Sequence, residues 1–376
     1  MTDNTTETIF SEVYYSLLED YKNGIIHCGT NGPYDDPETK VRNLCNLIIA
    51  SCANILAGNG TEDLKHIINR MSADLLSFED TDSLYIIRNK KDKDLCNGVL
   101  GHAWVIEAFI YLYQVTNDPI YIEKSQKIYF LHKFNDNIGV WSCPNKFGGK
   151  IDMTINHQIW FAGVAAELYS ITKNQYIYTD LSCFEKKFWN NTKVHSNGLF
   201  CHYVQTWNGI NKIKNNIRNI IDKTKTLLNL PSMNYKENGY HMFCLCGLAR
   251  LKLSGVGDKI FCDNKFIRAL EYCNSKTYFS MLEINNHERD VSTLTDKERM
   301  NDVNCNFYGY PYNAPGFEVE YVRCAFGVIL EQTVSKLEER QIAVTYNRNT
   351  KLFDQNAIDI YDLCYKVYEK LITTII

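Results

Sequence analysis

Apolar positions along this chain gather into helical stretches that begin polar and become apolar after about one turn. The clearest stretch starts at Asp152 and passes through Asn156 and His157 into small and apolar residues that continue to Leu168. A helix that is apolar almost all round belongs in the interior of a protein. Its polar first turn either supplies caps and internal hydrogen bonds or lines a polar cavity, because unpaired buried polar groups cost stability.

The same arrangement recurs along the chain. Helices of this buried type are predicted to begin near residues 40, 98, 155, 240 and 316, and most are followed by an amphipathic partner helix. Asp118 and Pro119 are typical of an N-cap and first helical position, so the turn between one such pair is very short. Amphipathic helices are also predicted over 5–22, 61–76 and 175–190, and a last helix over 356–375.

Long loops at one end of these helix pairs and short turns at the other repeat roughly every 50 to 70 residues, which indicates a repeat architecture. Buried helices alternating with amphipathic ones predict an all-α fold, an (α/α)6 toroid, as a single domain over 1–376. An open α-solenoid is the alternative, but its units would have more uniform loops.

In a toroid the N-termini of the inner helices open onto one face, where unpaired N–H groups and helix dipoles favour anions and hydroxyl oxygens. Amides, charged groups and indoles that converge in such a cleft are typical of a sugar site. The candidate binding residues are Arg42, Asn97, His102, Trp104, Asn156, Gln158, Trp160, Tyr240 and His241. For Arg42, a bridge to Asp35, Asp36 or Glu38 is the structural alternative, and for the indoles it is core packing.

The candidate catalytic residues are Asp152, His157, Glu318 and Glu107. Hydrolysis of a glycosidic bond needs two carboxyl groups, one protonated and one ionised, across the bond. Epimerisation or elimination needs paired bases about a sugar carbon, often His or Tyr. We expect Glu318 to share the cavity of Asp152 and His157, since its helix would be the last of the inner ring and would neighbour the first.

Composition limits the classes of function. The 376 residues carry a net charge of −4, which argues against a dedicated nucleic-acid binder with its usual basic face. The first residues lack the positive start and apolar run of a secretory signal. The longest apolar stretch, Cys45 to Ala57, contains Asn46, Ser51 and Asn54, so we expect no transmembrane segment.

Fourteen cysteines are scattered through the chain without any C-x-x-C pair. They are typical of small core residues in a reducing compartment, so we expect a cytoplasmic protein with reduced thiols. The nine histidines form neither H-E-x-x-H nor H-x-x-x-H, and we expect no metal site and no cofactor.

Three stretches resemble a known family: residues 32–39 (GPYDDPET) with Val41-Arg42-Asn43, residues 94–104 (DLCNGVLGHAW), and residues 155–162 (INHQIWFA). They resemble proteins encoded in bacterial capsule and O-antigen clusters and in archaeal protein-glycosylation clusters, which look like six-hairpin glycosidases. The resemblance covers most of the chain in order and implies glycan processing without naming a reaction.

These observations favour a carbohydrate-active enzyme, with a glycoside hydrolase acting on an acidic oligosaccharide as the first hypothesis. A sugar epimerase or polysaccharide lyase, and a glycan-binding toroid without chemistry, are the alternatives, because fold does not choose among them. A terpene-cyclase-like function is less favoured, because the sequence has no aspartate-rich D-D-x-x-D motif on a helix. The expected partner is an oligosaccharide or a nucleotide- or lipid-linked sugar. The sequence does not determine the oligomeric state.

Overall fold

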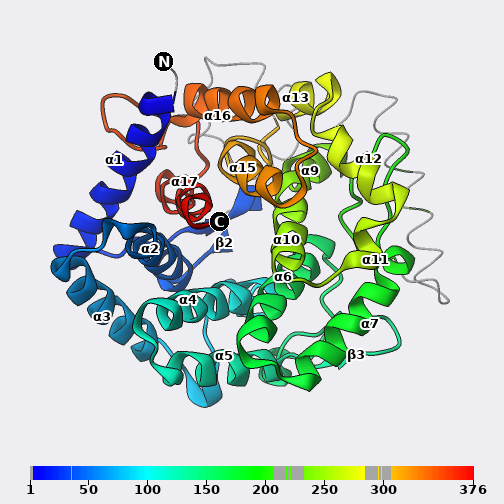
Figure 1. The fold of residues 1–376 in the computed structure, drawn as a ribbon, viewed down its shortest axis with the longest axis horizontal. Coiled ribbons are helices and arrows are strands. Elements are labelled where there is room, and N and C mark those ends of the chain that lie inside the picture. Colours follow the sequence, from blue (N-terminus) through cyan, green and yellow to red (C-terminus); the bar gives the residue numbers. More distant parts are fainter. Residues whose placement is uncertain are drawn as a thin grey trace.

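The protein is a toroid of two concentric rings of helices. The computed structural model describes residues 3–34, 36–205, 233–283 and 306–376, together with Ile217, Ile221, Thr295 and Glu298. The predicted (α/α)6 architecture is confirmed (Figure 1). The inner ring consists of α2 (Val41–Asn54), α4 (Leu100–Thr116), α6 (Ile155–Thr172), α10 (His241–Leu253), α15 (Pro315–Phe326), α17 (Ile360–Tyr365) and α18 (Tyr368–Leu371). The outer ring consists of α1 (Asp3–Lys22), α3 (Glu62–Ser77), α5 (Pro119–Leu131), α7 (Gln175–Asn191), α11 (Asp258–Phe261), α12 (Asn264–Tyr272), α13 (Lys276–Leu282) and α16 (Glu331–Thr345).

The inner ring closes through the C-terminal segment. Each inner helix contacts the next in the order α2, α4, α6, α10, α15, α18, and α18 then contacts α2. The expectation that the helix of Glu318 is the last inner helix is therefore wrong, because α18 lies between α15 and α2. The predicted helix over 356–375 is also divided, into α17, α18 and a 3-10 turn at Ile372–Ile375.

Short turns on one face of the toroid are built from helix-capping residues, among them the predicted cap Asp118. After α4, Asn117 adopts the left-handed conformation and the Asp118 carboxylate accepts a hydrogen bond from the Ile120 N–H at 3.0 Å. After α6, Lys173 is left-handed and Asn174 caps α7 in the same way. A left-handed residue ends one helix and the following cap starts the next, so the chain reverses within two residues.

The small residues of α6 allow it to pack closely on α10. A Cβ atom at Gly163 would lie 2.6 Å from the Gly247 carbonyl oxygen, and one at Gly247 would lie 3.2 Å from the Trp160 Cα. The two glycines therefore let these inner helices cross almost backbone to backbone, as the small residues after Trp160 predict.

Loops on the opposite face precede the inner helices and carry short paired segments. The paired segments are β1 (Thr30–Asn31) with β2 (Asp36–Pro37) and β3 (Phe134–Asn135) with β4 (Val140–Trp141). A short helix, α9 (Met233–Gly239), precedes α10. Single bridges pair Thr154 with Tyr203 and Val194 with Phe200. Within residues 198–204 these single bridges are the strand pairing that the structure shows.

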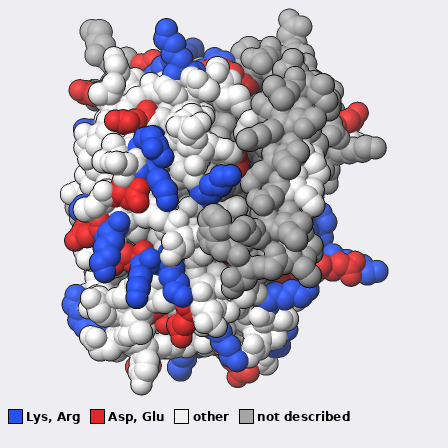
Figure 2. Space-filling model, turned by 90° about the vertical axis from the view of Figure 1, so that its right-hand side faces the viewer, with Lys and Arg blue, Asp and Glu red and all other residues white. Residues whose placement is uncertain are grey.

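One helical run, Val41–Asn59, is long and apolar enough to cross a membrane by length and composition, but 72% of it is buried inside the toroid. It joins α2 to a π-helical turn and is a core helix of the inner ring. On the outside, basic and acidic side chains are interspersed over the part of the face drawn in colour in Figure 2.

A buried pair of histidines joins α4 to the end of α5. His102 Nδ1 lies 2.8 Å from His132 Nε2, and His132 Nδ1 lies 2.9 Å from the Ser142 carbonyl oxygen, to which it donates. Burial lowers the pKa of His102 to about 4 and that of His132 to about 3, where the neighbouring His102 adds to the effect. Both rings are therefore neutral in the folded protein at neutral pH.

The pair is expected to weaken folding in acid. Unfolded histidine takes up a proton below about pH 6.5, whereas the folded rings do so only below about pH 4, so stability is lost as the pH falls through this window. Each ring contributes about 1.4 kcal/mol per pH unit. We expect a His102→Gln/His132→Gln protein to show a smaller loss of unfolding free energy than the wild type between pH 6.5 and 4, by urea denaturation. Buried carboxyls with raised pKa values, such as Glu38, act equally in both proteins. Equal slopes would contradict the assignment.

Candidate functional site

A cavity of about 670 Å³ opens on the loop face of the toroid, where the inner helices begin. Its size is that of a small-molecule site. It is lined by Asn31, Arg88, Asp92, Lys93, Asp94, Asn97, Gly98, Cys143, Phe147, Gly148, Lys150, Ile151, Asp152, Met153, Thr154, His157, His202, Lys236 and Tyr240. The loop-covered, polar site expected from the sequence is thus formed by segments distant in the chain.

Asp152 and His157 form a hydrogen-bonded pair in this cavity. Asp152 Oδ2 accepts from His157 Nδ1 at 2.8 Å and from the Val99 N–H at 3.0 Å, while Oδ1 accepts from the Thr154 N–H at 3.0 Å. Burial acts to raise the pKa of Asp152, but His157 and the two backbone donors outweigh it, and the pKa lies below its ordinary value. Because an ionised Asp152 can only accept hydrogen bonds, it keeps a proton on His157 Nδ1. The other ring nitrogen, Nε2, belongs to the same side chain, which lines the cavity.

Gly98 brings the 94–99 loop against this pair. Its φ is +69°, and a Cβ atom there would lie 1.9 Å from Asp152 Oδ2 and 2.7 Å from His157 Nδ1. The loop is held by Asp94, whose Oδ1 accepts from the Gly98 N–H at 2.7 Å. Glycine is therefore the residue that fits at position 98, where the loop touches the Asp152–His157 pair.

Gly98→Ala is expected to separate Asp152 from His157 and to lower turnover by about 10²-fold, the usual scale for general acid–base groups. Gly24→Ala is the matched control, because Gly24 also has a positive φ, +83°, but a Cβ atom there meets nothing within 4 Å. Backbone strain should lower the melting temperature of both proteins, and the clash with Asp152 should lower that of Gly98→Ala further, so rates are compared at a temperature where both are folded. Equal activity in both would show that the close approach at Gly98 has no part in the site.

His202 is placed beside His157 by backbone pairing. The Ile155 N–H donates to the His202 carbonyl at 2.9 Å, and the Val204 N–H donates to the Met153 carbonyl at 2.9 Å. Burial, with the charges of Lys236 and His157, lowers the pKa of His202 well below its ordinary value. Among the described residues no partner satisfies His202 Nδ1, a buried atom. The cavity therefore has a second, uncharged imidazole next to the first.

The residues from α9 to the start of α10 supply another wall. Lys236 and Tyr240 both line the cavity, and burial together with the nearby Lys93 lowers the pKa of Lys236 to about 8. The Tyr240 and His202 ring centroids lie 5.7 Å apart. With Arg88 and Lys150, these side chains make the lining more cationic than anionic.

A small chamber of about 30 Å³ lies next to the cavity and shares Asn31, His157 and Tyr240 with it. Arg42 and Trp104 line it, and the guanidinium carbon of Arg42 is 5.3 Å from the indole centroid. Arg42 also pairs with Glu38 at 2.9 Å and with Asp362. The structural bridge to Glu38 that the sequence left open is thus present, and the chamber has room for about one water molecule.

The structure brings some sequence candidates together in the cavity and its side chamber. Asp152, His157, Asn97 and Tyr240 line the cavity, while Arg42 and Trp104 line the chamber. Asn97 Oδ1 accepts from Asn31 and from Arg88, each at 3.0 Å. Roles for these residues stay predictions.

Glu107 and Glu318 lie outside both linings, contrary to our expectation that Glu318 shares the cavity with His157. Glu107 pairs with Arg250 at 2.5 Å in the interior, where neither side chain is exposed. Glu318 is buried beside Glu369, and burial followed by that second carboxyl raises its pKa well above the ordinary value. The position of α15 away from α2 explains the difference for Glu318.

The remaining binding candidates also lie outside the two linings. Gln158 forms hydrogen bonds with the backbone of Trp141 and Asp152, and His241 Nε2 lies 2.9 Å from the Ala269 carbonyl oxygen.

The other three candidates are His102, Trp160 and Asn156. His102 pairs with His132, and Trp160 stacks on Phe243 with 4.1 Å between ring centroids. Asn156 is buried, with no partner for its amide among the described residues. Apart from Asn156, their contacts are those of capping and packing.

Sequence reasoning missed several residues of the site, most of them in loops. They are Asn31, Arg88, Lys93, Asp94, Lys150, His202 and Lys236 in the cavity, and Tyr312, Lys366 and Glu369 in the chamber. The rule that long loops precede inner helices could have found His202, which stands in such a loop. Nothing in the sequence places Lys366 or Glu369, because their position depends on how the C-terminal segment closes the ring.

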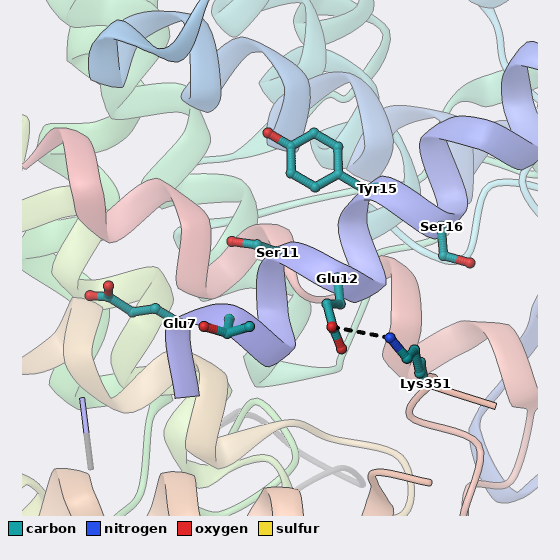
Figure 3. Close-up of a pocket in the computed structure, with 7 residues that line it drawn as sticks. Glu7, Ser11, Glu12, Tyr15, Ser16 and Lys351 are labelled. Atoms are coloured by element: carbon teal, nitrogen blue, oxygen red, sulfur yellow. Dashed lines mark hydrogen bonds and ion pairs between the residues drawn. The ribbon is translucent and has the colours of Figure 1, made fainter. Parts of the chain in front are cut away.

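A second hollow, of about 580 Å³, lies on the outer face of α1 and contains no comparable chemistry. Figure 3 shows its labelled residues Glu7, Ser11, Glu12, Tyr15, Ser16 and Lys351. Lys351 Nζ and Glu12 Oε1 form an exposed ion pair at 3.2 Å (Figure 3). Its lining has no imidazole and no buried charged group, so the cavity at the inner-helix N-termini is the better candidate.

No family model matches the chain. Archaeal glycosylation protein Q of Haloferax volcanii is 23% identical over 364 residues, which cover 92% of this chain and 91% of that protein. Among solved structures, cellobiose 2-epimerase from Bacillus thermoamylovorans has a TM-score of 0.62 with 12% identity and covers 99% of both chains. An α-amylase from Clostridium perfringens has a TM-score of 0.54 with 11% identity, covering 96% of this chain and 97% of its own.

At such identities the two structures show the fold alone. Both share the (α/α)6 toroid fold of this chain, and the sequence similarity to the protein named for archaeal glycosylation spans nearly the whole chain. The expected resemblance to an archaeal glycosylation protein with a six-hairpin toroid fold is confirmed.

Proposed function

We propose that this protein is a sugar epimerase or isomerase of glycan metabolism, which moves a proton at a carbon beside a carbonyl group. The observation that carries the proposal is the pair of imidazoles in one cavity: His157, oriented by the buried Asp152, and His202, placed beside it by backbone pairing. Inversion at a sugar carbon uses one proton carrier on each face, and histidine is the side chain that most often serves as such a carrier.

In the proposed reaction one imidazole is protonated and the other neutral at the start. The neutral ring takes the proton from the carbon, the carbon–hydrogen electron pair passes into an enediolate, and the protonated ring returns a proton to the other face. The two rings end with their protonation states exchanged. Lys236 and Asn97 offer donors for the enediolate oxygen in the same cavity.

The carboxyl groups of the cavity suit hydrolysis less well. Asp94 is bound to Arg88 at 2.5 Å and Asp152 is committed to His157, while Asp92 stands on an exposed loop. Glu369 has a pKa raised by burial to about 8, as a general acid requires, but it lines the small chamber. A chamber of about one water molecule does not admit a sugar ring. A facing acid and base across a glycosidic bond is therefore not formed by these groups.

The substrate class is proposed to be an acidic oligosaccharide. Arg88, Lys93, Lys150 and Lys236 line the cavity against Asp92, Asp94 and Asp152. A ligand with a carboxylate or phosphate would balance this excess of positive charge. Tyr240, which lines both hollows, offers an aromatic face to a pyranose ring.

A product screen in heavy water tests the reaction class. Reducing oligosaccharides with and without uronate residues are incubated with the protein and followed by mass spectrometry. The proposal predicts solvent deuterium in the sugar at unchanged composition, with uronate-containing sugars preferred. A gain of one water across a cleaved bond would instead identify a hydrolase, and cleavage without water would identify a lyase.

A further inference from the structure

A tight hairpin behind the cavity wall brings His195 and Cys201 to one side. Val194 pairs with Phe200, the His195 N–H donates to the Leu199 carbonyl at 2.8 Å, and the Cys201 N–H donates to the Lys193 carbonyl at 2.9 Å. Alternate residues of paired extended segments share a face, so positions 193, 195, 199 and 201 project together. The turn at Gly198, with φ +103°, makes this pairing possible.

Helix α9 adds a carboxylate to the same place. Glu237 Oε2 lies 2.8 Å from His195 Nε2, and Cys201 Sγ lies 3.3 Å from that nitrogen. One ligand atom from each of the three residues lies within 4.8 Å of the others. Cys201 and Glu237 are buried, whereas the His195 side chain is 34% exposed.

We propose that His195, Cys201 and Glu237 bind a divalent ion of the zinc class. Imidazole nitrogen, thiolate sulfur and carboxylate oxygen are the donors that zinc takes, at about 2.0 to 2.3 Å, which places neighbouring donors roughly 3.3 to 3.6 Å apart. The His195–Glu237 distance of 2.8 Å and the His195–Cys201 distance of 3.3 Å would each need to lengthen by about half an ångström or less. The exposed edge of His195 gives the ion a path from solvent and leaves a fourth position for water.

The ion would stiffen the wall of the cavity. The second oxygen of Glu237, Oε1, accepts from the backbone N–H of His202 at 3.0 Å. An ion on Oε2 would therefore tie the loop that carries His202 to the helix that carries Lys236. Binding displaces the Cys201 thiol proton and any proton shared by His195 and Glu237, and these protons pass to solvent. The site does not depend on the reaction proposed for the cavity.

Titration of the purified full chain with Co²⁺, after treatment with a chelator, tests the site. Bound thiolate gives cobalt a charge-transfer band in the near ultraviolet, and Zn²⁺ should displace it. We expect one cobalt ion per chain with this band, and a rise in Tm of a few °C when Zn²⁺ exceeds Kd about 100-fold. Cys201→Ser should abolish the band, and His195→Gln should weaken binding at least about 10-fold.

Cys262→Ser is the matched control, since Cys262 is exposed and belongs to neither group of possible ligands, and it should leave the band unchanged. Cys143→Ser separates this site from the group Asp94, Cys96 and Cys143, which also brings possible ligand atoms together. Absence of a band in the wild type overturns the proposal. A band that survives in Cys201→Ser but is lost in Cys143→Ser also overturns it and moves the metal to the other group.

Discussion

Replacing His157 by asparagine is expected to lower turnover of the sugar substrate by about 10²- to 10⁴-fold while the protein remains folded. Asparagine keeps a polar group near Asp152 but cannot carry a proton between substrate and solvent. The side chain is partly exposed in the cavity, so its loss removes little packing. Initial rates and melting temperatures of both proteins, measured on the same preparation, give the result.

Asp152→Asn is the companion variant. It preserves the shape of the carboxylate but removes the charge that fixes the proton on His157 Nδ1, so turnover should fall although His157 is intact. Folded variants that both retain wild-type rates would place the chemistry elsewhere.

Arg250→Met is expected to cost about 3 to 5 kcal/mol of unfolding free energy, the largest loss of stability that we predict. Arg250 on α10 pairs with Glu107 of α4 at 2.5 Å and with Glu167 of α6 at 2.8 Å. Its guanidinium carbon also lies 4.8 Å from the Trp160 ring centroid. Methionine fills the space of the side-chain stem but leaves the buried Glu107 and the partly buried Glu167 without this cation. Urea unfolding measures the effect.

Arg323→Met is the control, because Arg323 also pairs with a glutamate, Glu320 at 2.5 Å, but is 41% exposed. Exposed pairs contribute about 0 to 1 kcal/mol. Adding Glu107→Gln to Arg250→Met should restore part of the stability, since one stranded carboxyl is removed. If the Arg250 and Arg323 variants lose equal stability, the buried cluster does not hold the inner ring together.

The helices of the toroid were predictable because their causes are local. The transition from polar to apolar residues places the starts of α2, α4, α6, α10 and α15 within two residues of the observed ones. Capping by Asp118 and Asn174 has a direct signature in the sequence. The sixth inner position was harder, because Asp359 starts a short helix over Ile360–Tyr365 that breaks before Tyr368.

The site was predictable only where a helix start defines it. His157 and Asp152 follow from the first turn of α6, and the structure places them in the cavity. His202 was missed because its position depends on pairing between residues 153–155 and 202–204, which sequence alone does not show. Glu107 was a candidate acid because its partner Arg250 lies 143 residues further along the chain.

The grouping of His195, Cys201 and Glu237 was not predicted from the sequence for a similar reason. His195 and Cys201 are close in sequence, but Glu237 comes from α9, across residues that have no regular spacing to them. Spacing rules for zinc ligands recognise sites formed within one short segment. They do not recognise ligands that a hairpin and a helix bring together.

Solvent-deuterium exchange in a His202→Asn protein tests the central claim, that two imidazoles share the proton transfer. The wild type in heavy water should incorporate deuterium at the carbon beside the carbonyl and invert it, as followed by proton NMR of substrate and product. With His202 removed, His157 should still exchange that proton in the sugar epimer that faces it, while inversion falls at least about 10²-fold. Inversion at the wild-type rate in His202→Asn, or product carrying oxygen from labelled water at a cleaved bond, would contradict the account.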